Sequence, residues 1–186
     1  MRLYALCDQE LLDSRGIPLE EFIDVANSNS AEIIQYRNKS ADVAFIKTQL
    51  IKIRKMFDGF LIVNDAYELV EFCDGVHVGQ EDLESIDADI VKAVKILRSV
   101  IGKEKILGIS THNEKEVLQA NDMDLNYIGL GAYRDTSTKD VSTVLGNSLD
   151  SIASNSKHYV AAIGGVKKTD TFENITYHVI GSGLIS

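Results

Sequence analysis

Short apolar runs rich in β-branched residues recur along the whole chain, and they constrain its fold more than any other feature. The runs that favour β-strands span residues 2–7, 31–36, 59–63, 74–78, 105–109, 126–130, 158–163 and 177–180. Several of them are apolar almost throughout, which is typical of parallel strands covered by helices on both faces. The segments between most of them show helical patterns, at residues 18–28, 40–56, 66–73, 87–101, 111–121, 147–154 and 169–174.

Three of the predicted helices also carry a start signal. Pro18 stands at a favourable first helical position, and acidic residues follow it. Ser40 is a candidate N-cap for the segment 40–56. The sequence Thr-His-Asn-Glu at residues 111–114 has the pattern of a capping box. These signals support the alternation of strand and helix.

The number of strands predicts how the sheet is arranged. Eight strands that alternate with helices, at an average spacing of about 25 residues, indicate an α/β fold of the (βα)8 TIM barrel type with eight parallel strands. An open doubly wound sheet of five or six strands would leave two of the runs unexplained. The chain has one proline and no Gly/Ser-rich linker, so we predict a single domain over residues 1–186. Because the chain stops at Ser186, the final helix is expected to be truncated or missing.

Charge and composition exclude several classes of partner. The chain has 19 basic and 28 acidic residues and a net charge of −9, so it repels a phosphate backbone and is not expected to bind nucleic acid. Its apolar runs are all shorter than the roughly 18 residues of a membrane span. It opens without a signal-peptide pattern. Cys7 and Cys73 lie in apolar segments and are expected to be buried free thiols, which favours a cytoplasmic protein.

Polar residues and glycines follow the predicted strands, where the active site of a (βα)8 barrel lies. In chain order they include Gln35, Arg37, Lys39, Asn64, Asp65, Gln80, Glu81, Asp82, Ser110, Thr111, His112, Thr136, Thr138, Lys139, Gly164, Gly165, Gly181 and Ser182. Cations together with glycine-rich backbone suit a phosphate group. Asp65 and Asp82 can hold a Mg²⁺ ion that keeps several waters and takes phosphate oxygens as ligands. The pattern therefore predicts a magnesium-assisted enzyme that acts on phosphate or pyrophosphate esters.

One string stands out as specific, Gly-Val-His-Val-Gly-Gln-Glu-Asp at residues 75–82. Further characteristic segments lie at residues 3–8, 35–39, 61–65, 107–112, 127–131, 136–139 and 162–166. With these segments, the sequence resembles the thiamine phosphate synthase family over nearly its whole length. Each string alone is weak evidence, and their order and spacing together are strong evidence.

The resemblance implies a transferase that joins hydroxymethylpyrimidine pyrophosphate to hydroxyethylthiazole phosphate. Pyrophosphate leaves through a dissociative, carbocation-like step. The residues implied to bind the pyrophosphate are Arg37, Lys39, Asn64 and Lys139. The implied Mg²⁺ ligands are Asp65 and Asp82. Gln35 and Ser110 would address the pyrimidine or the charge near it. Residues implied to bind the thiazole phosphate are Thr136, Thr138, Gly165, Gly181 and Ser182.

Two features depart from the family pattern. After the sixth strand the family usually has Gly-Pro and then an apolar-aromatic pair, whereas this chain has Gly-Ala-Tyr-Arg-Asp at residues 131–135. The expected loss of the last helix removes part of the support for the thiazole phosphate. A sister group, the thiazole tautomerases, carries a histidine where this chain has Ala132 and tends to lack the string at 136–139, so both points favour the synthase.

Two other functions are kept as alternatives. A tautomerase would act without metal and would depend on His112. A non-catalytic protein that binds a thiamine precursor would not need the two aspartates. We interpret His77, which lies inside a strand rather than at its end, as a packed histidine or one that supports its neighbours. Family members are often homo-oligomers, so a homo-oligomer is compatible with the resemblance.

Overall fold

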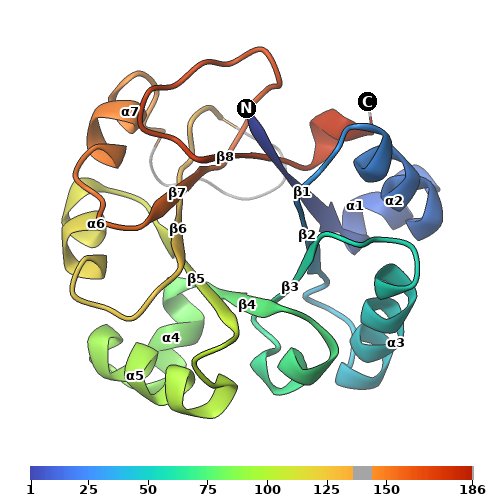
Figure 1. Ribbon diagram of the computed structural model, residues 1–186, viewed down its shortest axis with the longest axis horizontal. Helices are drawn as coiled ribbons and strands as arrows, with labels where there is room; N and C mark the ends of the chain where they lie inside the picture. The colour runs from blue at the N-terminus through green and yellow to red at the C-terminus, as the bar shows by residue number, and fades with distance from the viewer. Residues whose placement is uncertain (136–143, 186) are drawn as a thin grey trace.

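The computed structural model describes residues 1–135 and 144–185, which form the predicted (βα)8 barrel (Figure 1). The strands are β1 (Arg2–Asp8), β2 (Ile33–Arg37), β3 (Phe60–Asn64), β4 (Gly75–Val78), β5 (Ile106–Thr111), β6 (Tyr127–Leu130), β7 (Tyr159–Ala162) and β8 (Tyr177–Ile180). Each strand is parallel to its neighbours, in sequence order, and β8 pairs with β1 to close the barrel. Arg2 lies opposite Tyr177, and Ala5 lies opposite Ile180, across this closing pair.

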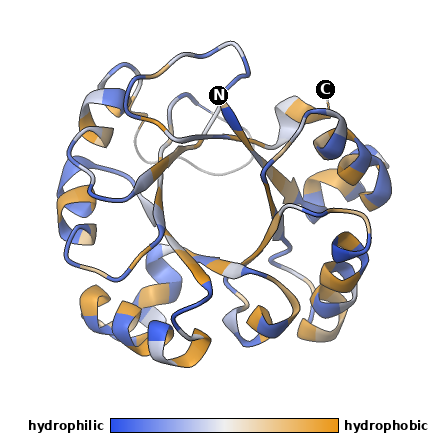
Figure 2. Cartoon of the chain, viewed as in Figure 1, coloured by the Kyte–Doolittle hydropathy of each residue, from blue (hydrophilic) through white to orange (hydrophobic). Residues whose placement is uncertain are grey.

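Helices surround the barrel. They are α1 (Gln9–Arg15), α2 (Leu19–Ser28), α3 (Val43–Arg54), α4 (Gln80–Ile86), α5 (Ile90–Ile101), α6 (Glu114–Ala120) and α7 (Ser148–Ala153), with 3₁₀ helices η1 (Tyr67–Phe72) and η2 (Ser182–Leu184). Figure 2 shows the expected amphipathic pattern, since each longer helix carries both apolar and polar residues around its axis. No helix in the described parts of the chain has the length and apolar character needed to cross a membrane.

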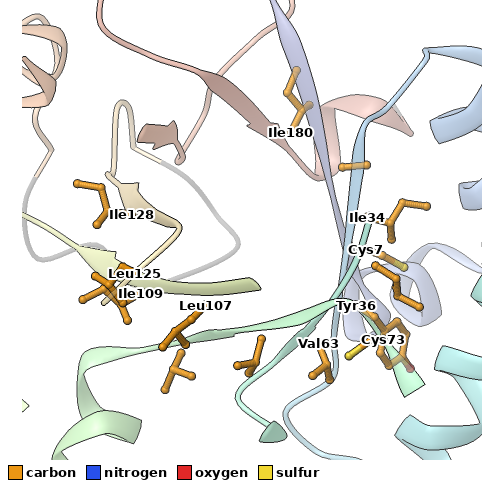
Figure 3. Close-up of a cluster of buried hydrophobic side chains, with 14 of the residues drawn as sticks. Cys7, Ile34, Tyr36, Val63, Cys73, Leu107, Ile109, Leu125, Ile128 and Ile180 are labelled. Carbon is orange, nitrogen blue, oxygen red and sulfur yellow. The ribbon is translucent and has the colours of Figure 1, made fainter. Parts of the chain in front are cut away.

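Apolar side chains form two separate layers. The larger cluster joins strands to helices and includes Ile34, Leu107 and Ile180 (Figure 3). The buried residues of the smaller cluster all belong to strands, and they lie in the interior of the barrel. Alternate residues of one strand therefore serve different layers: on β8, Val179 belongs to the inner cluster and Ile180 to the outer one. Cys7 and Cys73 are buried free thiols, as predicted.

Two helices start later than the sequence analysis predicted. Helix α3 begins after Asp42, whose carboxylate accepts a hydrogen bond from the backbone N–H of Phe45 at 2.8 Å. Ser40 lies in the preceding turn instead. Helix α6 is capped by Asn113, whose side chain accepts from the N–H of Glu116 at 3.0 Å. In both cases the cap is a side chain two residues after the predicted one.

Other boundaries were wrong for local physical reasons. The predicted helix 87–101 corresponds to α5, which begins later than predicted because Asp89 caps it. A separate helix, α4, precedes it. Helix α1 was missed, although Asp8 caps it by accepting from the N–H of Leu11. The predicted helix 66–73 is the 3₁₀ helix η1.

The segment 169–174 is irregular rather than helical. Two of its backbone N–H groups, those of Glu173 and Asn174, form hydrogen bonds to the Asp150 carboxylate at 3.1 and 3.0 Å rather than within a helix. The connection from β7 to β8 is therefore a loop. After β8 the described chain holds the short helix η2.

Candidate active site

The predicted site residues that the structure describes lie at or after the C-terminal ends of the strands, and a small cavity lies inside the barrel. Its walls come from strands of the barrel and the residue after β7, and they consist of Tyr4, Gln35, His77, Ser110, Tyr127, Gly129, Ala161, Ile163 and Val179. Two of the predicted site residues, Gln35 and Ser110, line it directly. A second hollow, beside Arg54 and Asp74, lies near the opposite ends of β3 and β4 and contains none of the predicted site residues.

A row of amides leads from the cavity to the first aspartate. Gln35 is buried on β2, and its Nε2 donates to Oδ1 of Asn64 at 3.1 Å. The Nδ2 of Asn64 in turn donates to Oδ2 of Asp65. The two amides therefore have fixed orientations, because each is held by its neighbour. The structure thus brings three of the predicted site residues into one hydrogen-bonded row.

Asp65 is held in an unusual backbone conformation. Its φ is +61°, a region that Asp and Asn tolerate better than other side-chain-bearing residues. Its backbone N–H donates to the carbonyl of His77 at 2.8 Å, and its Oδ1 accepts from the N–H of Gly79 at 3.2 Å. These bonds tie the end of β3 to the end of β4. They direct the Asp65 carboxylate toward the start of α4, where Asp82 lies in the first turn.

The electrostatics of Asp65 indicate what this position is suited to hold. Burial raises the pKa of Asp65, and the negative charge of Asp82 raises it further, while the Gly79 N–H, Lys39 and Asn64 act against them. Two facing carboxylates of this kind repel each other unless a cation lies between them. The described residues contain no group of three or more His, Cys, Asp or Glu side chains placed to hold a metal ion. A Mg²⁺ ion fits this donor set, because Mg²⁺ is commonly bound by one or two carboxylates, waters and phosphate oxygens.

The raised pKa of Asp65 leads to a prediction about stability. The folded state carries a cost when Asp65 is ionised, so this cost develops as the pH rises from the usual Asp range through the raised pKa, and it vanishes below about pH 4, where the carboxyl is protonated in both states. The melting temperature of Asp65→Asn relative to the wild type should therefore be higher at pH 7 than at pH 4 in the metal-free protein. The comparison of the two pH values cancels the constant effect of the substitution on the hydrogen bonds from Asn64 and Gly79. Thermal unfolding in EDTA at pH 7 and pH 4 measures this, and a difference that is the same at both pH values would contradict the assignment.

Arg37 is paired with an acid that the sequence analysis did not single out. The Nη1 of Arg37 forms an ion pair with Asp8, whose side chain is only 4% exposed. Asp8 ends β1 and also caps α1. The signal was present in the sequence, since Asp8 directly follows the predicted strand 2–7, just as Asn64 and Asp65 follow the predicted strand 59–63. Lys39 lies farther out and is exposed.

Ser110 and His77 lie together inside the cavity. Ser110 lies near the end of β5, and its Oγ lies 3.0 Å from Nε2 of His77. The carbonyl of Ser110 accepts from Nε2 of Gln80. His77 therefore faces the cavity, in agreement with the interpretation of a histidine that supports its neighbours.

The glycines after β7 make room for the loop that follows β6. Gly164 and Gly165 have φ of +87° and +65°, and a Cβ on Gly164 would lie 2.5 Å from Cβ of Ala132. Arg134 spans the two loops by donating to the carbonyl of Gly165 at 2.7 Å and to both carboxylate oxygens of Asp170 at 2.7 Å. The departure from the family pattern at residues 131–135 thus supplies an ion pair that fastens the β7–β8 loop.

This ion pair predicts a pH-dependent contribution to stability. Hydrogen bonds from Arg134 lower the pKa of Asp170, so the contribution is present above the usual Asp range and is lost as the pH falls through the lowered value. Asp170→Asn should lower the melting temperature by a few degrees at pH 7 and by less near pH 3. The matched control is Glu173→Gln, an exposed acid in the same loop. Equal melting temperatures for the wild type and Asp170→Asn at pH 7 would contradict the prediction.

The remaining predicted residues are distributed as follows. Gly181 and Ser182 follow β8 and are half-buried, at the start of η2. Thr136, Thr138 and Lys139 lie outside the described residues. His112, the residue on which a tautomerase would depend, is engaged at the start of α6, where its N–H donates to Glu116 Oε2 at 2.8 Å and its Nδ1 lies 3.0 Å from the same oxygen.

Comparisons with known proteins agree with this geometry. The family model described as thiamine monophosphate synthase matches residues 3–186. A thiamine-phosphate synthase of Persephonella marina is 34% identical over 174 residues, which is 90% of this chain and 78% of the relative. One from Clostridium acetobutylicum is 31% identical over 191 residues, which is 100% of this chain and 85% of the relative.

A solved structure shows the same fold. The thiamine phosphate pyrophosphorylase from Pyrococcus furiosus superimposes with a TM-score of 0.77 at 23% sequence identity, covering 97% of this chain and 85% of that one. The match over residues 3–186 includes every predicted site residue. The chain therefore belongs to the thiamine monophosphate synthase family.

Proposed function

We propose that the protein is a thiamine phosphate synthase. It would couple hydroxymethylpyrimidine pyrophosphate with hydroxyethylthiazole phosphate and release pyrophosphate. The single observation that carries the proposal is the row Gln35–Asn64–Asp65, with Asp82 facing its end, in a chain that belongs to this family. The row joins an amide inside the cavity to a pair of carboxylates at its mouth. One substrate that has a heterocycle at one end and a pyrophosphate at the other fits such an arrangement.

In this proposal the chain binds and neutralises a leaving group. Arg37, Lys39, Asn64 and Lys139 would hold the pyrophosphate oxygens, and Asp65 and Asp82 would hold Mg²⁺. When bound, Mg²⁺ would neutralise charge on the leaving pyrophosphate. The C–O bond of the pyrimidine methylene then breaks, pyrophosphate keeps the electron pair, and the thiazole nitrogen attacks the carbocation-like carbon. Such catalysis is positional and electrostatic, so it requires no protein nucleophile.

The other residues would place the two heterocycles. Gln35 and Ser110, which line the cavity, would contact the pyrimidine. Gly165, Gly181 and Ser182 would offer backbone N–H groups to the thiazole phosphate, together with Thr136 and Thr138. A cytoplasmic location belongs to the proposal as well, because both cysteines are free thiols and suit a reducing compartment.

An end-point assay read by mass spectrometry tests the proposal. The purified protein is incubated with the pyrimidine pyrophosphate, the thiazole phosphate and Mg²⁺, and thiamine phosphate is measured. We expect product that disappears in EDTA. No product above background would overturn the proposal. A parallel incubation with the carboxylated thiazole phosphate and no metal identifies a tautomerase, and calorimetry with each substrate identifies a protein that only binds.

A further inference from the structure

A series of hydrogen bonds joins four side chains that line the cavity inside the barrel. The hydroxyls of Tyr4 and Tyr127 lie 2.8 Å apart. The Tyr127 hydroxyl lies 2.9 Å from Nδ1 of His77, and Nε2 of His77 lies 3.0 Å from the hydroxyl of Ser110. The four residues come from β1, β6, β4 and β5. Most barrel interiors are filled with branched apolar side chains, so four linked polar groups at this place require an explanation.

Two glycines leave space for the rings of Tyr127 and His77. A Cβ on Gly108 would lie 2.1 Å from Cζ of Tyr127, and a Cβ on Gly129 would lie 3.1 Å from Cε1 of His77. The two rings are stacked, with centroids 5.5 Å apart and an interplanar angle of 27°. The ring positions are therefore set by backbone on one side and by each other, and small shifts of either ring meet resistance.

The direction of the hydrogen bonds follows from Tyr4, the last residue of the series. Tyr4 is 1% exposed, and the hydrogen-bond partner that residues 1–135 and 144–185 give its hydroxyl is Tyr127. Burial raises the pKa of both tyrosines, so both keep their protons at neutral pH. If Tyr4 donates to Tyr127, then Tyr127 has its own proton left to donate to Nδ1 of His77. The reverse direction would leave the Tyr4 proton without an acceptor among residues 1–135 and 144–185, which is costly.

We infer that Tyr127 is a positioning residue that fixes the proton of His77 on Nε2 and thereby turns the Ser110 hydroxyl outward as a donor. With Nε2–H donating to the Ser110 oxygen, the serine proton is directed away from His77 and into the cavity. The site then presents a hydrogen-bond donor and favours a ligand with an acceptor atom at this point. Under the proposed function, on which this last step rests, that acceptor is a ring nitrogen or the ester oxygen of the pyrimidine pyrophosphate.

The proton position can be measured without any substrate. The nitrogen shifts of a ¹⁵N-histidine-labelled sample distinguish the two neutral tautomers, and the His77 signals are identified by their loss in His77→Asn. We expect the proton on Nε2 in the wild type and a mixture of tautomers in Tyr127→Phe. The matched control is Tyr177→Phe, because Tyr177 is buried in the same inner cluster and its hydroxyl takes no part in this series of hydrogen bonds. A wild-type proton on Nδ1, or an unchanged spectrum in Tyr127→Phe, would overturn the inference.

Kinetics test the effect on the ligand. Tyr127→Phe should lower kcat/KM for the pyrimidine pyrophosphate by about two- to tenfold, because the mixture keeps a fraction of the productive tautomer and the value of one hydrogen bond sets the upper limit. It should leave KM for the thiazole phosphate unchanged. In a Ser110→Ala background the same change should have no further effect, because the serine donor is already absent. Additive losses of kcat/KM in the double variant, or equal losses of kcat/KM for both substrates, would overturn the positioning role. The tautomer measurement stands even if the protein proves to catalyse another reaction.

Discussion

Asp82→Ala is expected to lower turnover by about 10²–10³-fold, because the variant loses half of the carboxylate pair that would hold the metal on the leaving pyrophosphate. Asp82 lies in the first turn of α4 and is half-buried, so we expect little change in stability. The measurement is the steady-state rate of thiamine phosphate formation at saturating Mg²⁺, together with a thermal unfolding curve.

A control on the same helix makes this result specific. Glu84→Gln removes one negative charge from an exposed position of α4 and should leave the rate unchanged. The apparent affinity for Mg²⁺, measured as the concentration that gives half-maximal rate, should weaken in Asp82→Ala only. A near-normal rate for Asp82→Ala would remove Asp82 from the metal site and would leave Asp65 as its one proposed carboxylate.

Arg37→Met is expected to have the largest effect on stability, a loss of about 3 kcal/mol, because it leaves the buried carboxylate of Asp8 without its partner. The variant should also lose activity, since Arg37 would bind the pyrophosphate. Denaturant unfolding gives the first quantity, and the product assay gives the second.

A second substitution separates the two roles of Arg37. The double variant Asp8→Asn/Arg37→Met lacks the buried charge, and the asparagine that replaces Asp8 can still cap α1, because Asn is as good an N-cap as Asp. The double variant should recover most of the lost stability and remain inactive. Recovery of activity together with stability would show that Arg37 has only a structural role.

The fold could be predicted from the sequence because the same pattern, an apolar strand followed by a helical segment, is repeated along the chain. Each strand is a short apolar run, and eight such runs with helical segments between them leave few arrangements other than a barrel. The boundaries were less predictable, since they depend on single capping groups such as Asp42 and Asp89 and on side chains from elsewhere in the chain. The segment 169–174 shows the second case, because Asp150 satisfies its backbone and no helix forms.

The places of some proposed site residues could be predicted from the sequence, whereas their contacts could not. Asn64, Asp65 and Asp82 were identified from their places after strands, and the structure brings them together. The partners inside the barrel were not identified. Tyr4 and Tyr127 occur in runs that read as ordinary apolar strands, and the sequence pattern does not say that two hydroxyls 123 positions apart meet. A long-range pairing of this kind depends on strand order and register.

The closing pair of the barrel has a consequence for the order in which the chain assembles. Seven of the eight strand pairings join neighbours in sequence, whereas the pairing of Arg2 with Tyr177 joins residues from the two ends of the fold. Closing so long a loop carries the largest entropic cost among these pairings, so we expect β1–β8 to form last. Strands β1 to β7 can associate one after another as they leave the ribosome. During that time the outer edges of β1 and β7 are unpaired, and chaperones would be needed most at this stage.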